Sequence, residues 1–143
     1  MTGKPPTPRE LIDDEMCFAC GKRNRDGLHL EFEATDDGVA TSIVFPKKFQ
    51  GYRDVVHGGL VSTILDEAMV TLLNEMGLLA VTAELTVRFV SPVPVGRRVD
   101  VAAHLSGHRG RIYALTATAT LDDGTVAATA ESRCVAVGSL DAA

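Results

Sequence analysis

Residues 58–76, GGLVSTILDEAMVTLLNEM, stand apart from the rest of the chain. Apolar side chains recur there at helical spacing and cover much of the circumference, namely Leu60, Val61, Ile64, Leu65, Ala68, Met69, Leu72 and Leu73. A helix that is apolar on most sides has to be surrounded by protein. Gly77 follows the periodic run, where a glycine commonly ends a helix. The segment therefore predicts one long, largely buried helix.

The segments on either side of this helix predict β-strands. Before it, residues 28–34 and 39–45 alternate apolar with polar side chains around a turn, so these two strands should pair antiparallel. After it, four more strands are expected over residues 81–90, 97–107, 111–121 and 125–137. The strands need one buried face and the helix needs cover on most sides. Both needs are met if the sheet wraps around the helix.

The residues before the first strand predict an arm. Residues 1–24 are polar and proline-rich, and residues 10–16 could make a turn or two of helix. Because 143 residues suit a single domain, we divide the chain into an arm, 1–24, and one domain, 25–143. The start lacks the apolar core of a secretory signal, and no apolar run reaches the roughly 20 residues that span a bilayer. We expect a cytoplasmic protein without a membrane partner.

Composition narrows the classes of partner and ligand. A net charge of −5 argues against nucleic acid, because binding to a phosphate backbone needs a surplus of Lys and Arg on one face. Three cysteines are an odd number in a chain without an export signal, so reduced thiols are expected. Cys17 and Cys20 form a single C-x-x-C, but tetrahedral zinc needs two further ligands, and His29 and Cys134 lie at no recognised spacing. We therefore assign no metal.

The start of the helix and one carboxylate inside it can carry chemistry. Gly58 and Gly59 let a ligand approach the backbone closely, and the first helical turn leaves N–H groups with a partial positive charge, which suits an oxyanion. Asp66 lies about two turns into the apolar helix, where a carboxylate without partners costs several kcal/mol. The structural alternative is that Asp66 points to solvent or bonds a neighbouring strand.

Two neighbouring residues leave further alternatives open. Glu67 follows Asp66 and points about 100° away around the helix, so only one of the two should face the site. By its position alone, His57 is a general acid, an oxyanion donor or a structural cap. A serine hydrolase is disfavoured, because Ser62 and Ser91 lack the Gly-x-Ser-x-Gly context of its nucleophile.

The order and spacing of these residues resemble one family. The motif HGG at residues 57–59, six intervening residues and then DEA at 66–68 are similar to the hotdog-fold acyl-CoA thioesterases, in particular the phenylacetic-acid-degradation type. The approach FQG at 49–51 and the strand AELTVRFVSP at 83–92 look like that family in order and spacing. The resemblance covers nearly the whole domain from Leu28 on. It implies an α+β hotdog fold, an antiparallel sheet wrapped around a long central helix.

The resemblance also implies an activity and four catalytic roles. Asp66 would act as base or nucleophile on the thioester of an acyl-CoA, and the Gly58 N–H would polarise the thioester oxygen. His57 would support this loop and the thioester. Thr82 matches a hydroxyl residue, contributed by the partner subunit in the family, that helps to hold the attacking water. Thioester hydrolysis needs only a carboxylate, a positioned water and an oxyanion hole, so no cofactor is expected beyond coenzyme A within the substrate.

Further positions are assigned to substrate binding: Gln50, Gly59, Glu67, Arg109, Gly110 and Arg111. An asparagine often found six residues before the histidine is replaced here by Gly51, and Gln50 is the candidate to take over its hydrogen bond. Arg109, Gly110 and Arg111 are candidates for the coenzyme A phosphates, with a solvated β-turn as the alternative. The pairs Lys47-Lys48 and Arg97-Arg98 are weaker candidates. The C-x-x-C is interpreted as a lineage trait of the arm.

Two alternative functions, an acyl-CoA hydratase and an acyl-CoA sensor, stay open beside the thioesterase. A hotdog hydratase or dehydratase of acyl-CoA would place its His and carboxylate in different motifs, and a non-catalytic acyl-CoA sensor would tolerate Asn at position 66.

An edge strand of a wrapped sheet is commonly covered by a second copy, so we expect a homodimer, assembling further into a homotetramer, with sites at the subunit boundary. The period of two places Arg88 on one strand face with Thr82 and Glu84, which predicts an Arg88–Glu84 pair.

Overall fold

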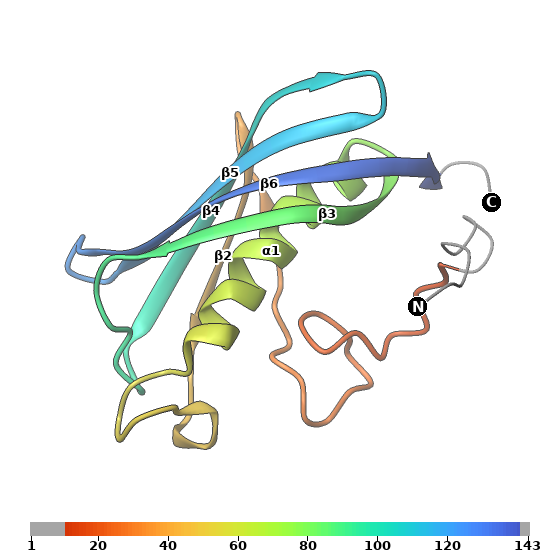
Figure 1. The fold of residues 1–143 in the computed structure, drawn as a ribbon. Coiled ribbons are helices and arrows are strands. Elements are labelled where there is room, and N and C mark those ends of the chain that lie inside the picture. The colour runs from red at the N-terminus through yellow and green to blue at the C-terminus, as the bar shows by residue number, and fades with distance from the viewer. Residues whose placement is uncertain (1–10, 141–143) are drawn as a thin grey trace, which may run out of the picture.

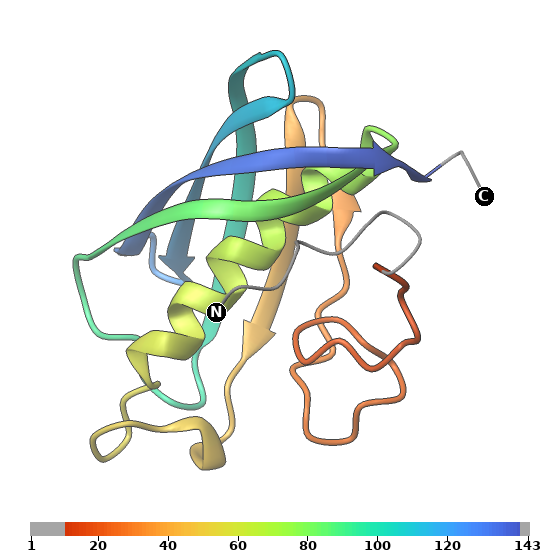
Figure 2. The same ribbon diagram turned by 45° about the vertical axis from the view of Figure 1, so that its right-hand side comes forward.

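The computed structural model describes residues 11–140. One long helix, α1 (Gly58–Glu75), lies in the hollow of an antiparallel sheet that curves around it, as Figures 1 and 2 show from two directions. The strands are β1 (Glu33–Ala34), β2 (Gly38–Val44), β3 (Leu78–Phe89), β4 (Arg98–Arg109), β5 (Ile112–Leu121) and β6 (Val126–Ser139), and a 3-10 turn, η1 (Lys47–Phe49), follows β2. Their order across the sheet is β1-β2-β4-β5-β6-β3. This is the α+β hotdog architecture that the sequence predicts.

The core forms where the apolar face of α1 meets the inner face of the sheet. The buried helix residues are Val61, Ile64, Leu65, Ala68, Met69, Leu72 and Leu73, and burial of each large apolar side chain stabilises the fold by about 1.5–3 kcal/mol. Alternate residues of β4, such as Val99, Val101 and Ala103, complete this layer from the sheet. Gly77, with φ +84°, lies just past the helix and donates its N–H to the Asn74 carbonyl at 2.9 Å. The helix prediction is thus confirmed to within a residue at its end.

The first strand is much shorter than predicted. Of residues 28–34, only Glu33 and Ala34 pair with β2, antiparallel as expected. The N–H groups of Leu28 and Leu30 instead donate to the carbonyls of Phe18 and Ala19, at 2.8 and 2.9 Å. His29 between them has φ +54°, outside the strand region. Residues 28–32 therefore form backbone hydrogen bonds with the arm and not with a neighbouring strand, although their side chains alternate as in a strand.

The arm itself contains no helix within residues 11–24. The Asp13 and Asp14 carboxylates accept hydrogen bonds from the N–H groups of Glu15 and Met16, two residues on. Such local side-chain bonds compete with helical ones. The predicted turn or two of helix at 10–16 is therefore wrong for the described residues, and Glu10 lies outside them. The following loop packs onto the domain, with Ala19 buried, and Figure 2 shows it beside α1.

A β-bulge in β3 changes which side chains face the helix. Thr82 pairs with Cys134 of β6 and Glu84 with Arg133, so Ala83 has no partner in the register. The extra residue breaks the period of two. Thr82 consequently faces α1, whereas Glu84 and the residues that alternate with it lie on the outer face. The shared face predicted for Thr82, Glu84 and Arg88 is wrong, and no ion pair within residues 11–140 joins Arg88 to Glu84.

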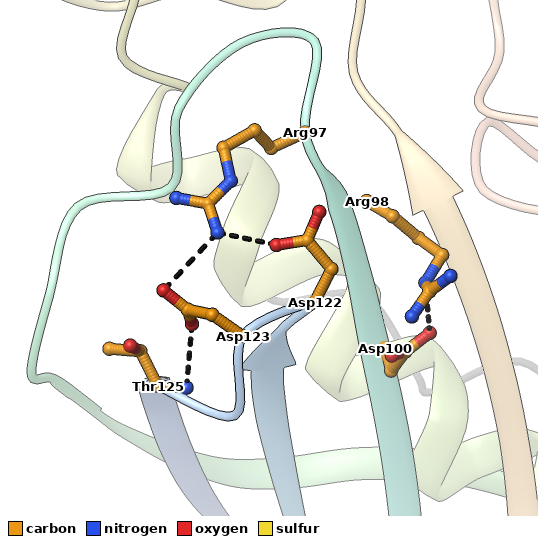
Figure 3. Close-up of polar contacts among 6 residues, drawn as sticks. All are labelled: Arg97, Arg98, Asp100, Asp122, Asp123 and Thr125. Atoms are coloured by element: carbon orange, nitrogen blue, oxygen red, sulfur yellow. Dashed lines mark hydrogen bonds and ion pairs between the residues drawn. The ribbon is translucent and has the colours of Figure 1, made fainter.

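The turn between β5 and β6 is fastened to the start of β4. Figure 3 shows the Arg97 guanidinium between Asp122 and Asp123, and the Thr125 N–H donating to Asp123 at 2.9 Å. These contacts, the Thr125 hydrogen bond first among them, lower the pKa of Asp123 to about 2. Arg98 pairs with Asp100 at 3.2 Å. Arg97 and Arg98 therefore form ion pairs with carboxylates of their own chain.

Within residues 11–140, no helix has the length and apolar character needed to cross a bilayer.

Candidate active site

His57 caps the first turn of α1 with its side chain. The imidazole Nδ1 accepts a hydrogen bond from the Gly59 N–H at 2.9 Å, so in the neutral ring the proton lies on Nε2. A Cβ on Gly59 would lie 3.1 Å from that Nδ1, which explains the glycine. The hydrogen bonds of residues 11–140 leave the Gly58 N–H without an acceptor. The helix start therefore offers one backbone donor and one imidazole donor to an anionic oxygen.

Asp66 is hydrogen-bonded to a hydroxyl group on the adjacent strand. Thr82 Oγ1 donates to Asp66 Oδ1 at 2.7 Å, and both side chains are half-buried between α1 and β3. The Cys134 thiol lies behind the threonine, with its Sγ 3.8 Å from Thr82 Oγ1. One oxygen of Asp66 is thus oriented by the protein. The family resemblance implied that a partner subunit brings Thr82 to the site, but Thr82 of the same chain makes this contact.

An apolar pocket opens beside the start of α1. Its volume is about 630 Å³, within the usual range for small-molecule sites. The lining residues are Gly51, Tyr52, Val55, Val56, His57, Gly58, Val61, Phe89, Val90, Ser91, Pro92 and Val93. The segment after β3 reaches this end because the Val56 N–H donates to the Val93 carbonyl at 2.9 Å. Tyr52 and residues 89–93 were not assigned to the site from the sequence, although residues 89–92 end the strand that resembles the thioesterase family.

The two halves of the predicted machinery lie apart within one chain. Asp66 is eight positions after Gly58, which at a rise of 1.5 Å per residue places the two about 12 Å apart along the helix axis. A thioester group is only a few bonds long, so one carbonyl cannot contact the Gly58 N–H and the Asp66 carboxylate of a single chain. Asp66 is accordingly absent from the lining of the pocket at His57 and Gly58.

Glu67 faces a different neighbourhood from Asp66. Its Oε1 lies 3.9 Å from the Cys17 Sγ of the arm. Burial raises the pKa of Glu67, while hydrogen bonds from Cys20 and Cys17 act in the opposite direction. The divergence of the two adjacent carboxylates follows the predicted rotation around the helix. Glu67 lies among the arm residues, away from the Asp66–Thr82 pair.

Gln50, the candidate replacement for the missing asparagine, forms its hydrogen bond within the loop before α1. The Gln50 Oε1 accepts a hydrogen bond from the Asp54 N–H at 3.0 Å, which closes the loop before α1. Gly51, and not Gln50, lines the pocket. A Cβ on Gly51 would make ordinary contact with His57, at 3.4 Å from its Cα. The role proposed for Gln50 at the thioester therefore finds no support in this chain's own contacts.

The basic hairpin is at the far end of the molecule from His57. Gly110, with φ +60°, forms the turn between β4 and β5 (Figure 1), and the Arg111 carbonyl accepts from the Ala136 N–H at 2.8 Å. Ala136, on β6, pairs with Ala80 near the start of β3, the strand that follows the C-terminal end of α1. Arg109, Gly110 and Arg111 therefore lie at the same end of the sheet as the start of β3, whereas His57 lies near Phe89, at the other end of β3.

Comparison with known proteins decides the family. Residues 54–128, which are 75 of the 143, match the model of the thioesterase superfamily. The chain belongs to the thioesterase superfamily. It is a thioester hydrolase, as the sequence predicts, and helix α1 and strand β3 both fall within the matched residues. All of the pocket-lining residues except Gly51 and Tyr52 fall there too.

Solved structures share the fold of this thioesterase at low sequence identity. The Escherichia coli PaaI protein from the phenylacetic acid degradation operon is 18% identical with a TM-score of 0.73, covering 78% of this chain and 82% of its own. The Streptococcus mutans protein smu.793, bound to acetyl CoA, is 17% identical with a TM-score of 0.72, covering 77% and 90%. A hypothetical thioesterase from Streptococcus pneumoniae with coenzyme A is 17% identical with a TM-score of 0.72, covering 77% and 87%. No curated protein matches the chain.

Proposed function

We propose that this thioesterase hydrolyses acyl-CoA to the free acid and coenzyme A, with Asp66 as the catalytic carboxylate. The observation that carries the proposal is the 2.7 Å hydrogen bond from Thr82 to Asp66, which orients a half-buried carboxylate on the central helix. Relatives in fold support the same assignment. The Streptococcus pneumoniae protein has been studied with an aspartate or a threonine replaced by alanine, and these two residues are 16 apart in its chain. Asp66 and Thr82 have the same separation.

The chemistry follows from the groups at hand. The Asp66 carboxylate either takes a proton from water, which then adds to the thioester carbon, or attacks that carbon itself to form an anhydride that water hydrolyses. In both routes the carbonyl oxygen gains negative charge, and the Gly58 N–H and His57 Nε2–H are the donors that stabilise it. Collapse of the intermediate expels the coenzyme A thiolate, which takes up a proton. The thiolate is a good leaving group, so no metal is needed for the bond to break.

The site we propose is shared between two chains. Because Gly58 and Asp66 of one chain are about 12 Å apart along the helix, one thioester would meet the Gly58 N–H of one chain and the Asp66–Thr82 pair of its partner. An antiparallel pairing of two β3 strands brings this about. The N-terminal end of one β3 then lies beside the C-terminal end of the other, where Phe89 adjoins Gly58.

The edge of the sheet supports such a dimer. β3 is an edge strand, 12 residues long, and within residues 11–140 it pairs with β6 on one side and with no strand on the other. The side chains next to α1 on this strand are apolar yet open to solvent in one chain, with Leu85 36% and Phe89 57% exposed. Long, apolar edge strands are commonly covered by a second copy. Further assembly into a tetramer remains part of the proposal.

The substrate has two parts, and different regions would hold them. The pocket at the start of α1 is lined mainly by Val and Phe side chains and suits an acyl group of short to medium length or an aromatic one. In the antiparallel dimer, Arg109, Gly110 and Arg111 of the partner come to the end of the molecule where the pocket opens. The two guanidinium groups of this turn are exposed and can meet the phosphates of coenzyme A.

The test is hydrolysis of a panel of acyl-CoAs with short, medium, long and aromatic acyl groups, followed with a thiol-reactive dye. Wild type should hydrolyse several of them, and Asp66→Asn should lose about 10²-fold or more in kcat, the size expected for a missing catalytic base. Glu75→Gln, an exposed carboxylate at the end of the same helix, is the matched control and should keep its activity.

Three outcomes would contradict the proposal. If Asp66→Asn stays active and Glu67→Gln fails, the carboxylate has been assigned wrongly. If no acyl-CoA is hydrolysed but some bind tightly, the chain is a sensor. If an enoyl-CoA is hydrated faster than any thioester is cleaved, the chain belongs to the hydratase alternative.

A further inference from the structure

Three metal-ligating side chains converge where the arm meets α1. The Sγ atoms of Cys17 and Cys20 and a carboxylate oxygen of Glu67 all lie within 4.8 Å of one another. The two thiols are three residues apart in the arm, whereas Glu67 is 50 residues after Cys17, on the helix. All three side chains are half-buried. Spacing in the sequence shows only two of these ligands, and the fold supplies the third.

The loop that carries the two cysteines is held in place by its own backbone. The Gly21 N–H donates to the Cys17 carbonyl at 2.8 Å, which closes the turn around both thiols. A Cβ on Gly21 would lie 2.4 Å from the Cys17 nitrogen, so only glycine fits directly after the second cysteine. The hydrogen bonds from Leu28 and Leu30 to Phe18 and Ala19 tie the same loop to the domain. The thiols are thus positioned in advance of any ligand.

Within residues 11–140, no cationic side chain forms an ion pair with this cluster. A half-buried carboxylate without a counter-ion has a desolvation cost that contacts with two thiols offset only in part. A divalent cation bound between the three groups would supply the missing charge.

We propose that Cys17, Cys20 and Glu67 bind one Zn²⁺ ion that fastens the arm to α1, with water as the fourth ligand. Thiolate and carboxylate ligands in tetrahedral geometry are typical of zinc. Zn–S and Zn–O bonds of about 2.3 and 2.0 Å place sulfur and oxygen roughly 3.5 Å apart across a tetrahedron. Cys17 Sγ and Glu67 Oε1 are 3.9 Å apart, so a shift of a few tenths of an ångström suffices. Binding converts two thiols to thiolates and releases their two protons to solvent.

The role of this site is separate from hydrolysis. Glu67 points away from the Asp66–Thr82 pair, and the zinc ligands lie on the arm side of the helix. Bound zinc would cross-link two segments distant in the sequence and so stabilise the fold. The inference does not rest on the proposed acyl-CoA activity, because its readouts are metal content, thiol reactivity and thermal stability.

The experiment uses the full chain without a histidine tag, purified from zinc-supplemented cells without chelator. Wild type should contain close to one zinc per chain, Cys17→Ser/Cys20→Ser less than about a tenth of that, and Cys134→Ala, the matched control with its buried thiol on β6, the wild-type amount. Cobalt should replace zinc and show the intense sulfur-to-metal absorption of thiolate ligands. Glu67→Gln should weaken zinc binding by about 10-fold or more, since one ligand of the ion is lost.

A second measurement avoids variants that fail to fold. Zinc added to metal-free wild type should shield two of its three cysteines from a thiol reagent, release two protons per ion and raise the melting temperature. Wild type that takes up no zinc after incubation and dialysis would overturn the proposal. So would zinc content unchanged in the double cysteine variant, or a Cys17–Cys20 disulfide in protein prepared under reducing conditions.

Discussion

Thr82 on β3 donates a 2.7 Å hydrogen bond to Asp66 on α1, and it faces the helix only because a β-bulge at Ala83 interrupts the strand. Replacement by Val keeps the branched shape of the side chain and removes the donor. We expect Thr82→Val to lower kcat by about 10-fold, the worth of one hydrogen bond to a charged group, with little change in KM. Steady-state kinetics with the best acyl-CoA measure this. Thr82→Ser retains the hydroxyl and should stay within about threefold of wild type, so equal losses in both variants would point to packing instead.

The shared site predicts rescue between two inactive variants. Asp66→Asn lacks the carboxylate, and Gly58→Pro lacks the N–H at a position where a helix tolerates proline. When one chain of a dimer carries Asp66→Asn and the other carries Gly58→Pro, one of the two sites combines an intact Gly58 with an intact Asp66. Mixed and refolded in equal amounts, the pair should recover about a quarter of wild-type activity, because about half of the dimers are mixed and each has one working site. If all catalytic groups came from one chain, the mixture would stay as inactive as its components.

Gly59 should be more sensitive to substitution by alanine than Gly51. A Cβ on Gly59 would press against His57 Nδ1 at 3.1 Å and displace the cap, whereas a Cβ on Gly51 would lie 3.4 Å or more from its neighbours. We expect Gly59→Ala to lower kcat/KM by roughly 10-fold, as for loss of a hydrogen bond that positions the oxyanion donors, and Gly51→Ala to stay within about threefold. The two variants should be assayed together with their melting temperatures. A larger loss in Gly51→Ala would contradict the assignment of His57 as the cap.

The raised pKa of Glu67 predicts how stability changes with pH when metal is removed. Its ordinary value is 4.5, and burial places the folded value higher. The folded chain therefore holds a proton that the unfolded chain has released, so stability falls as pH rises from 4.5 through the folded pKa. In chelator, Glu67→Gln should melt at a higher temperature than wild type above this range, and the difference should vanish below it. With saturating zinc the order should reverse, because Gln is a poor ligand. Exposed Glu75→Gln is the control and should follow wild type throughout.

Asp123 should contribute to resistance against acid. Its hydrogen bond from Thr125 and its contact with Arg97 lower its pKa to about 2 from an ordinary value of 3.8. Stability from these contacts is present above pH 3.8 and is lost as pH falls through 2. Melting temperatures between about pH 2 and 5 should therefore fall less steeply for Asp123→Asn than for wild type. Asp36→Asn, in the exposed turn between β1 and β2, serves as the control, and a matching change there would assign the effect to net charge.

Several candidate site residues could be named in advance because their signal is local. A glycine pair at a helix start and a carboxylate in an apolar run predict Gly58, Gly59 and Asp66, whose roles stay a prediction. The structure shows His57 as the helix cap, one of its three predicted roles. Tyr52 and the residues after β3 carry no such signal. These residues line the pocket because a backbone hydrogen bond from the Val56 N–H to the Val93 carbonyl joins two loops that are distant in the sequence.

The sequence by itself determined the long helix, the four strands after it and the wrapped sheet, because the apolar periods of 3.6 and 2 are properties of neighbouring residues. It also determined that Asp66 and Glu67 point in different directions, since rotation per residue is set by helix geometry. Tertiary structure decided the rest. The arm captured the backbone groups of the expected first strand, the bulge at Ala83 turned Thr82 toward Asp66, and the helix carried Glu67 to Cys17 and Cys20. These outcomes depend on hydrogen bonds and packing between segments far apart in the chain, which no local pattern records.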